Sequence, residues 1–250
     1  RGTEDARKAL LRTLISASPP DLEAVIAQAS RLGLDLRQGA VALFARRISA
    51  ESRSPDELQL PRRGLLADLG EGRIYGLLSP LPAVDSDGEA EVLAADLRSR
   101  GMMVALSVRR DPAGLHDALR EAELLVELAG VPDSSLYSHE ETYRLLIGVL
   151  LRDPGELELL RAQTILPLTA YDSKHETELL ATLQEFLIHH GSTTETAAAM
   201  ALHRHTVGYR LSRVQEVSGL SPYESDGRER LSLGLKAHRI LEADERRAAR

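Results

Sequence analysis

Residues 179–222 read LLATLQEFLIHHGSTTETAAAMALHRHTVGYRLSRVQEVSGLSP. The pattern predicts a first helix that ends at Gly191, because glycine readily adopts the left-handed conformation that stops a helix. Ser192 and Glu195 form a capping box that begins a short alanine-rich helix, and a turn near 201–203 separates it from a longer helix. Two helices joined by such a turn are typical of a helix-turn-helix, whose second helix reads DNA. The longer helix repeats apolar residues at i, i+4 and i+7, at Val207, Leu211 and Val214.

The side of the longer helix away from this apolar stripe is the expected DNA-binding face. Steps of 100° per residue place His205, Tyr209 and Ser212 on the side opposite Val207. The first turn of a helix carries positive partial charge and free backbone N–H groups that suit a phosphate, and arginine contacts phosphate or guanine. The pattern alone leaves open a plain helical hairpin within a bundle. The residues expected to contact DNA are Thr193, Thr194, His203, Arg204, His205, Thr206, Tyr209, Arg210 and Arg213.

The charge of this segment is opposite in sign to that of the chain. Residues 189–213 hold three arginines against one glutamate, a local charge of +2, whereas the 250-residue chain carries −7. Phosphate contacts need clustered Lys and Arg, so an acidic chain does not coat itself with nucleic-acid-binding surface. A local DNA-binding patch remains compatible with these charges.

The composition is that of a globular protein, with 43% hydrophobic and 28% charged residues. The absence of cysteine excludes disulfides, thiolate metal sites and cysteine nucleophiles, and fits a reducing cytoplasm. No apolar run approaches the roughly 20 residues of a membrane span, so no membrane partner is expected. Because the chain begins at Arg1 rather than Met, we expect that residues upstream of it have been removed.

Upstream of the helix-turn-helix, we expect an N-terminal helix in residues 1–20 and an α/β domain in residues 21–135. Asp21 is a good N-cap for a helix that ends at Gly33. Strand-like and helical segments then alternate, which predicts a sheet covered by helices. The expected strands are 41–44, 65–69, 73–78 and 102–108, with a hairpin turn at Gly70 and Gly72, and the expected helices are 89–100 and 115–129.

After residue 135 only helices are predicted, as a helical connector in 136–172 and a helix-turn-helix domain in 173–250. Capping boxes begin at Asp153, Ser173 and Ser192, each with a glutamate three residues later. A last helix near 228–247 should close the domain. Its basic residues alternate with acids, which favours an ordinary charged surface over DNA contact. These residues are Arg228, Arg230, Lys236 and Arg239.

The stretch quoted above resembles the C-terminal DNA-binding domain of the PucR/CdaR family of bacterial transcription regulators. The family's recognition helix opens with His-Arg-x-Thr-x-x-Tyr-Arg-Leu, matched here at 203–211. His205 stands where the family usually has Asn, and Gly208 where it often has a basic residue. These differences bear on which DNA sequence is read more than on whether DNA is bound. The resemblance implies a cytoplasmic, sequence-specific regulator that binds double-stranded DNA as a homodimer.

Residues 7–44 and 115–143 look like the GGDEF-related domain that precedes the helix-turn-helix in these regulators. The expected fold class is therefore an α/β (or α+β) GGDEF-like domain followed by an all-α helix-turn-helix domain. An active diguanylate cyclase carries a Gly-Gly-Asp/Glu-Glu-Phe hairpin whose acids hold two metals, whereas the candidate turn at 69–73 offers only Glu71. We therefore expect no enzyme activity. The resemblance implies a catalytically inactive domain used for sensing a small-molecule effector, for dimerisation or for coupling.

Two other functions stay open from the residues. The chain could be a small-molecule or nucleotide sensor whose helical domain signals to a protein partner, or it could retain nucleotide cyclisation or hydrolysis. No cofactor or metal is expected, because two candidate clusters lack the required pattern: the acids lack calcium-loop spacing, and the histidines lack accompanying carboxylates or cysteines. These clusters are Asp85, Asp87, Glu89 and Glu91, and His189, His190, His203 and His205.

Overall fold

The structure is a computed structural model that describes residues 2–16, 21–48, 64–79, 86–129 and 136–249. The chain divides into two compact units, Arg1–Ser134 and Ser135–Arg250, and each is described by itself. The predicted break at Pro19 and Pro20, and Asp85 of the acidic cluster, lie outside the described residues.

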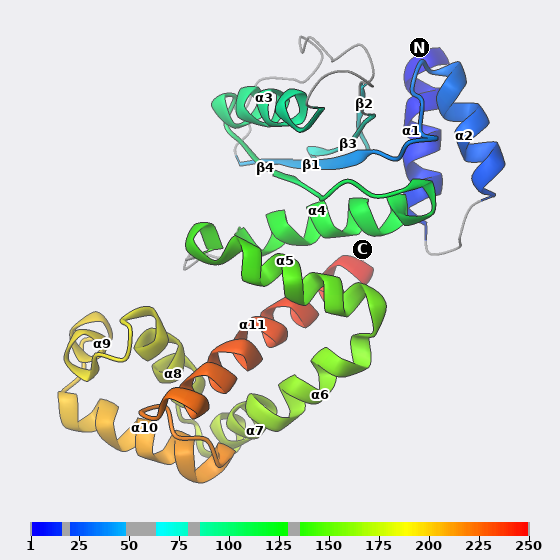
Figure 1. Ribbon diagram of the computed structural model, residues 1–250. Coiled ribbons are helices and arrows are strands. Elements are labelled where there is room, and N and C mark those ends of the chain that lie inside the picture. The colour runs from blue at the N-terminus through cyan, green and yellow to red at the C-terminus, as the bar shows by residue number, and fades with distance from the viewer. Residues whose placement is uncertain (1, 17–20, 49–63, 80–85, 130–135, 250) are drawn as a thin grey trace. The chain divides into compact units, whose positions relative to one another are not determined.

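The first unit is built on a four-stranded antiparallel sheet (Figure 1). α3 (Ser86–Ser99) lies between β3 and β4 in the chain. In the sheet, β1 lies between these two strands and runs antiparallel to both. β3, α3 and β4 therefore form a split β-α-β unit. Phe44 of β1 lies opposite Tyr75 of β3. All four predicted strands are present, although β1 continues to Arg47 and β4 already ends at Leu106. In the sheet order, the strands are β2 (Gly64–Asp68), β3 (Arg73–Leu78), β1 (Val41–Arg47) and β4 (Met102–Leu106).

Different helices cover the two faces of this sheet (Figure 1). Successive strand residues point to opposite faces. Ala42 and Phe44 therefore belong to one apolar core, with α1, α2 and α4, and Leu43 and Ala45 belong to the other, with α3. The predicted sheet covered by helices is confirmed. The three helices of the first face are α1 (Gly2–Ile15), α2 (Leu22–Arg31) and α4 (Leu115–Ala129).

The predicted hairpin joins β2 to β3 through three residues with positive φ: Gly70 at 117°, Glu71 at 57° and Gly72 at 71°. Glycine adopts this region without steric cost, which explains the two glycines. The backbone N–H of Gly70 also donates to Asp68 Oδ1 at 2.8 Å. The exposed tip of the turn presents a single acid, Glu71.

Three carboxylates of α4 are buried against the sheet side of the unit. Each is paired with an arginine from a strand or from the segment after β4. A buried charge that loses its partner is strongly destabilising, so these pairs fix α4 on the sheet. The pairs are Arg46–Glu127, Arg73–Glu123 and Arg110–Glu121.

The second unit contains only helices among its described residues (Figure 1). The longest helix, α11, packs along α6 and also contacts α5 and α8. Gly234 of α11 lies against Thr164 of α6, where an added Cβ would come within 1.9 Å of Thr164 Oγ1. The helices are α5 (Leu136–Arg152), α6 (Pro154–Thr164), α7 (Leu166–His175), α8 (Leu179–Ile188), α9 (Thr193–Ala199), α10 (Arg204–Ser218) and α11 (Ser225–Ala248).

Three of the four predicted N-caps are confirmed, including Asp21 at the start of α2, and the fourth, Ser173, is wrong. Asp153 Oδ1 accepts from the Gly155 N–H, and Ser192 Oγ accepts from the Glu195 N–H. Ser173 instead lies inside α7, whose C-cap residue Glu176 has a left-handed conformation. The next helix is capped from outside its own sequence, because Asp172 accepts from backbone N–H groups at its start. These are the N–H groups of Leu179 and Leu180, at 2.8 and 2.9 Å.

None of the helices in the described ranges combines the length and the apolar character needed to cross a lipid bilayer.

Candidate nucleic-acid interface

α8, α9 and α10 form a small three-helix arrangement around one apolar cluster. Phe186 of α8, Ala197 of α9, and Val207 and Leu211 of α10 are all buried in it. The small side chain of Ala197 lets α9 approach the other two helices closely. The predicted inward positions of α10 are confirmed, because Val207, Leu211 and Val214 are fully buried.

The turn between α9 and α10 has a defined geometry. Ala201 takes a positive φ of 53°, and the Leu202 N–H returns to the Ala197 carbonyl at 2.9 Å. His203 then caps α10, with its Nδ1 accepting from the His205 N–H at 3.3 Å. The two imidazole rings lie with centroids 5.0 Å apart. This tight turn holds α9 and α10 as a helix-turn-helix.

The first turn of α10 is exposed. Arg204, His205 and Thr206 are all exposed, and Tyr209 one turn further is 63% exposed. Within the described residues, Arg204 has no hydrogen-bonded or ionic partner, so its guanidinium is available to a phosphate or a base. Of the predicted residues on α9, Thr194 is exposed and Thr193 partly so.

The other two predicted arginines are engaged with neighbours in the protein. Arg210 Nη1 donates to Glu178 Oε2 at 3.0 Å and to Thr182 Oγ1 at 3.2 Å, which ties α10 to α8. Arg213 donates to Tyr209 Oη at 3.1 Å and stacks over that ring. Glu178 and Thr182 precede the helix-turn-helix, and the sequence pattern did not identify them as partners of Arg210. Tyr209 lies on the exposed side of α10 itself.

The pKa of Arg213 is raised above its ordinary value, first by the hydrogen bond with Tyr209 and then by the carboxylate of Glu216. Arg213 therefore stays charged. Tyr209 and Arg213 form a pre-arranged pair on the exposed side of α10, suited to a phosphate or a base edge.

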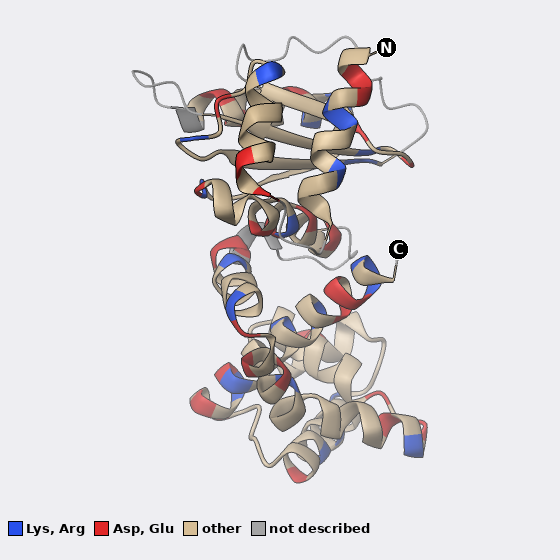
Figure 2. Cartoon of the chain, turned by 90° about the vertical axis from the view of Figure 1, so that its right-hand side faces the viewer, with Lys and Arg blue, Asp and Glu red and all other residues tan. Residues whose placement is uncertain are grey.

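Charge on the ribbon is intermixed rather than segregated (Figure 2). Both signs of charge occur in this unit, but α10 itself carries three arginines and one glutamate, so the +2 of residues 189–213 is a local feature. Within the described residues, no group of three or more His, Cys, Asp or Glu side chains is arranged to hold a metal ion.

The helix-turn-helix is similar in sequence to known regulator domains. Residues 179–237 match the PucR C-terminal helix-turn-helix domain. The chain is 31% identical over 187 residues to a Thermomonospora curvata protein described as an uncharacterized protein in the pkwA 5′ region, covering 72% of this chain and 89% of that protein. It is also 30% identical over 127 residues to the transcriptional activator PmfR of Paenarthrobacter nicotinovorans, covering 48% of this chain but only 26% of the activator.

Among solved structures, the chain is similar to a regulator of polyketide synthase expression from Bifidobacterium adolescentis. The two share 20% sequence identity with a TM-score of 0.44, over 95% of this chain and 98% of the other.

Proposed function

Because the chain belongs to the PucR family of helix-turn-helix transcription regulators, we propose that it binds a specific double-stranded DNA sequence through α9 and α10. The observation that carries the proposal is the exposed first turn of α10, where Arg204 has no partner among the described residues. Free backbone N–H groups and the positive end of the helix favour phosphate there, while His205, Thr206 and Tyr209 face outward to the bases.

The regulator acts as a homodimer in this proposal. One short recognition helix reads few base pairs, so affinity and specificity need two copies on half-sites about 34 Å apart, one turn of DNA. Light scattering with and without DNA tests this: a monomeric mass in both conditions would contradict the dimer.

Residues 21–135 serve as a GGDEF-like domain without catalysis, residues 136–172 as a connector, and residues 173–250 as the DNA-binding domain. The β2–β3 hairpin supports the first assignment, because its tip offers Glu71 alone where metal-assisted chemistry needs paired acids. This domain responds to a small-molecule effector, and the whole protein works in the cytoplasm, where its DNA lies.

Fluorescence anisotropy on the full chain tests DNA binding. The probes are a duplex from upstream of its own gene and a scrambled duplex, each at two salt concentrations. We expect tight binding to the first only, weakening with salt as counterions are released. Arg204→Ala should lose about 1–3 kcal/mol, roughly 5- to 150-fold in Kd, if it reads a base.

Arg230→Ala is the matched control, since Arg230 is an exposed arginine of α11 away from the helix-turn-helix turn. It should bind like the wild type. Equal, weak binding of both duplexes, unchanged in Arg204→Ala, would contradict DNA reading and favour a sensor that signals to a protein partner. Metal-dependent turnover of a nucleoside triphosphate would instead contradict the silent domain.

A further inference from the structure

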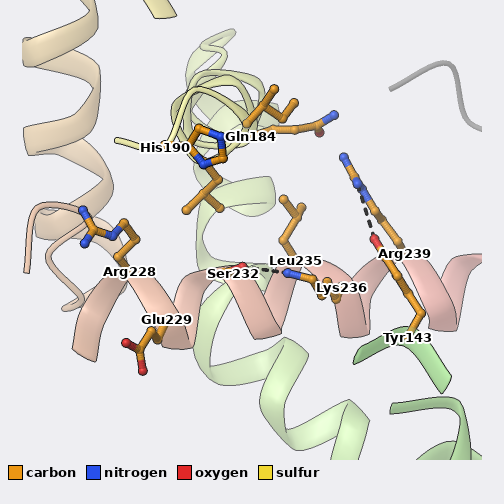
Figure 3. A pocket seen from close by; sticks show the side chains of 11 residues that line it. Tyr143, Gln184, His190, Arg228, Glu229, Ser232, Leu235, Lys236 and Arg239 are labelled. Carbon is orange, nitrogen blue, oxygen red and sulfur yellow. Dashed lines mark hydrogen bonds between the residues drawn. The ribbon is translucent and has the colours of Figure 1, made fainter. Parts of the chain in front are cut away.

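A cavity of about 470 Å³ lies in the helical unit among α5, α8 and α11 (Figure 3). This is within the ~300–1,000 Å³ of small-molecule sites, which combine apolar walls with a few placed polar groups. Leu187, Ile188 and Leu235 supply apolar wall, and the Tyr143 phenol and Ser232 hydroxyl supply polar groups. The cavity has the build of a ligand site and is separate from the exposed face of α10.

The charge of the cavity is positive in an acidic chain. Arg228, Lys236 and Arg239 line it, all from α11, and His190 adds an imidazole. Among the described lining residues the one carboxylate is Glu229, which accepts from Ser225 Oγ at 3.1 Å. Figure 3 shows Glu229 on the opposite side of α11 from His190.

The three cations are partly buried and, within the described residues, none forms an ion pair. Lys236 Nζ donates to Ser232 Oγ at 2.8 Å, and Arg239 Nη1 lies 3.5 Å from the Tyr143 hydroxyl (Figure 3). Arg239 Nη2 is buried and has no hydrogen-bond partner in the part of the chain that the structure describes. Burial, and then the charge of Arg239, lower the pKa of Lys236. Unpaired buried donors and uncompensated charge cost free energy that a bound anion would recover.

We propose that this cavity binds a small organic anion. Its carboxylate or phosphate oxygens lie on Lys236 and Arg239, one turn apart on α11, and its apolar part lies on Leu187 and Leu235. Arg228 is eight residues before Lys236, about 12 Å along the helix axis, and so reaches a second anionic group only on an extended ligand.

DNA phosphate is the other source of anionic oxygen. A rigid duplex reaches exposed cations such as Arg204, whereas Nη2 of Arg239 is buried. The partly buried cations and the apolar wall beside them favour a small molecule.

Thermal unfolding and titration calorimetry of the full chain test the site, with phenyl phosphate and citrate as probes and sodium chloride at matched ionic strength. We expect at least one probe to bind and to raise Tm by ~5–10 °C at a concentration 100-fold above its Kd. Lys236→Met and Arg239→Met should each lose this rise, and Arg230→Met on the same helix should keep it.

The ligand-free Tm of Lys236→Met should equal or exceed that of the wild type, because the substitution removes a partly buried charge without a counterion. A purely structural lysine would lower it. The proposal is overturned if neither probe raises Tm beyond sodium chloride, or if both Met variants keep the rise. It is also overturned if the Met variants lose affinity for the scrambled duplex while the probes do not bind.

Discussion

Arg210 of α10 lies within 3.0 Å of Glu178, the residue directly before α8, so an ion pair joins the recognition helix to its scaffold helix. The same guanidinium also donates to Thr182, a fully buried residue of α8. An arginine that its motif predicts to contact DNA therefore also ties α10 to α8.

The two roles of Arg210 can be separated by removing either partner. Arg210→Ala should lower the free energy of unfolding by ~1 kcal/mol, since a pair with one exposed member contributes little, and should weaken DNA binding. Glu178→Ala should cost similar stability but retain DNA binding, because the arginine remains. Urea unfolding and anisotropy measure both; equal losses of DNA affinity would mean that Arg210 acts only by fixing α10.

Asp172 and Ser173 are neighbours with different expected effects. Asp172→Ala removes the acceptor for two N–H groups of α8 and for the Thr177 hydroxyl, and should cost ~1–2 kcal/mol. Ser173→Ala alters an exposed position in the last turn of α7 and should stay within ~0.5 kcal/mol. Urea unfolding followed by far-ultraviolet circular dichroism compares them, and a larger loss for Ser173→Ala would restore the capping box.

Glu123 is 1% exposed and paired with Arg73. Glu123→Ala should destabilise the first unit by ~3–5 kcal/mol, because it leaves a partly buried arginine uncompensated. The matched control is Glu91→Ala, which breaks an exposed pair with Arg98 and should cost less than ~0.5 kcal/mol. Equal midpoints in urea for the two variants would contradict a role for the buried pair.

Two helix glycines should respond oppositely to alanine. Nothing lies within 4 Å of a Cβ at Gly208 in α10, so Gly208→Ala should stabilise the protein by ~0.5–1 kcal/mol. Gly234→Ala should destabilise it, because its Cβ overlaps Thr164. DNA binding by Gly208→Ala should be unchanged; a marked loss would show that the DNA backbone approaches α10 at this position.

His238 should make the helical unit less stable in acid. Burial lowers the pKa of His238 below the ordinary 6.5, and the charges of Arg161 and Arg239 lower it further. The carboxylates of Glu242, 3.4 Å away, and Glu245 raise this pKa but do not outweigh burial. The unfolded chain then binds a proton that the folded protein does not, so stability falls as pH drops below about 6.5.

Urea midpoints between pH 8 and 5 test this expectation, with the range set at about one to two units around the ordinary histidine pKa. His238→Gln should reduce the fall in stability. His205→Gln, at an exposed position on α10, should follow the wild type. Identical pH profiles for the wild type and His238→Gln would contradict the lowered pKa.

Local patterns predicted most of the fold. The strands, the Gly70–Gly72 turn and the inward residues of α10 depend on alternation, turn chemistry and helical spacing within a few residues. The prediction of an N-cap at Ser173 was wrong because a cap can come from a neighbouring helix. Asp172 belongs to α7, and the backbone bends between α7 and α8 so that its carboxylate accepts from the start of α8.

The partners of Arg210 could not be predicted from the sequence, because Glu178 and Thr182 lie 32 and 28 residues before it. The shared face of the cavity cations could have been predicted from the sequence, but acidic residues lie near them along the chain and make the segment look like an ordinary charged surface. Positions 228, 232, 236 and 239 follow helical spacing and share one side of α11, so plotting that helix by face separates them from Arg230.

Leu235 of α11 belongs to the apolar cluster that also contains Val214 of α10, and it lines the cavity on its other side. Close-packed interiors transmit small displacements because they have few voids to absorb them. A molecule that displaces Leu235 therefore disturbs this cluster, to which α10 contributes Val214. The cavity and α10 thus border one apolar cluster, so a change in the size of residue 235 alters both the cavity wall and the cluster that contains Val214.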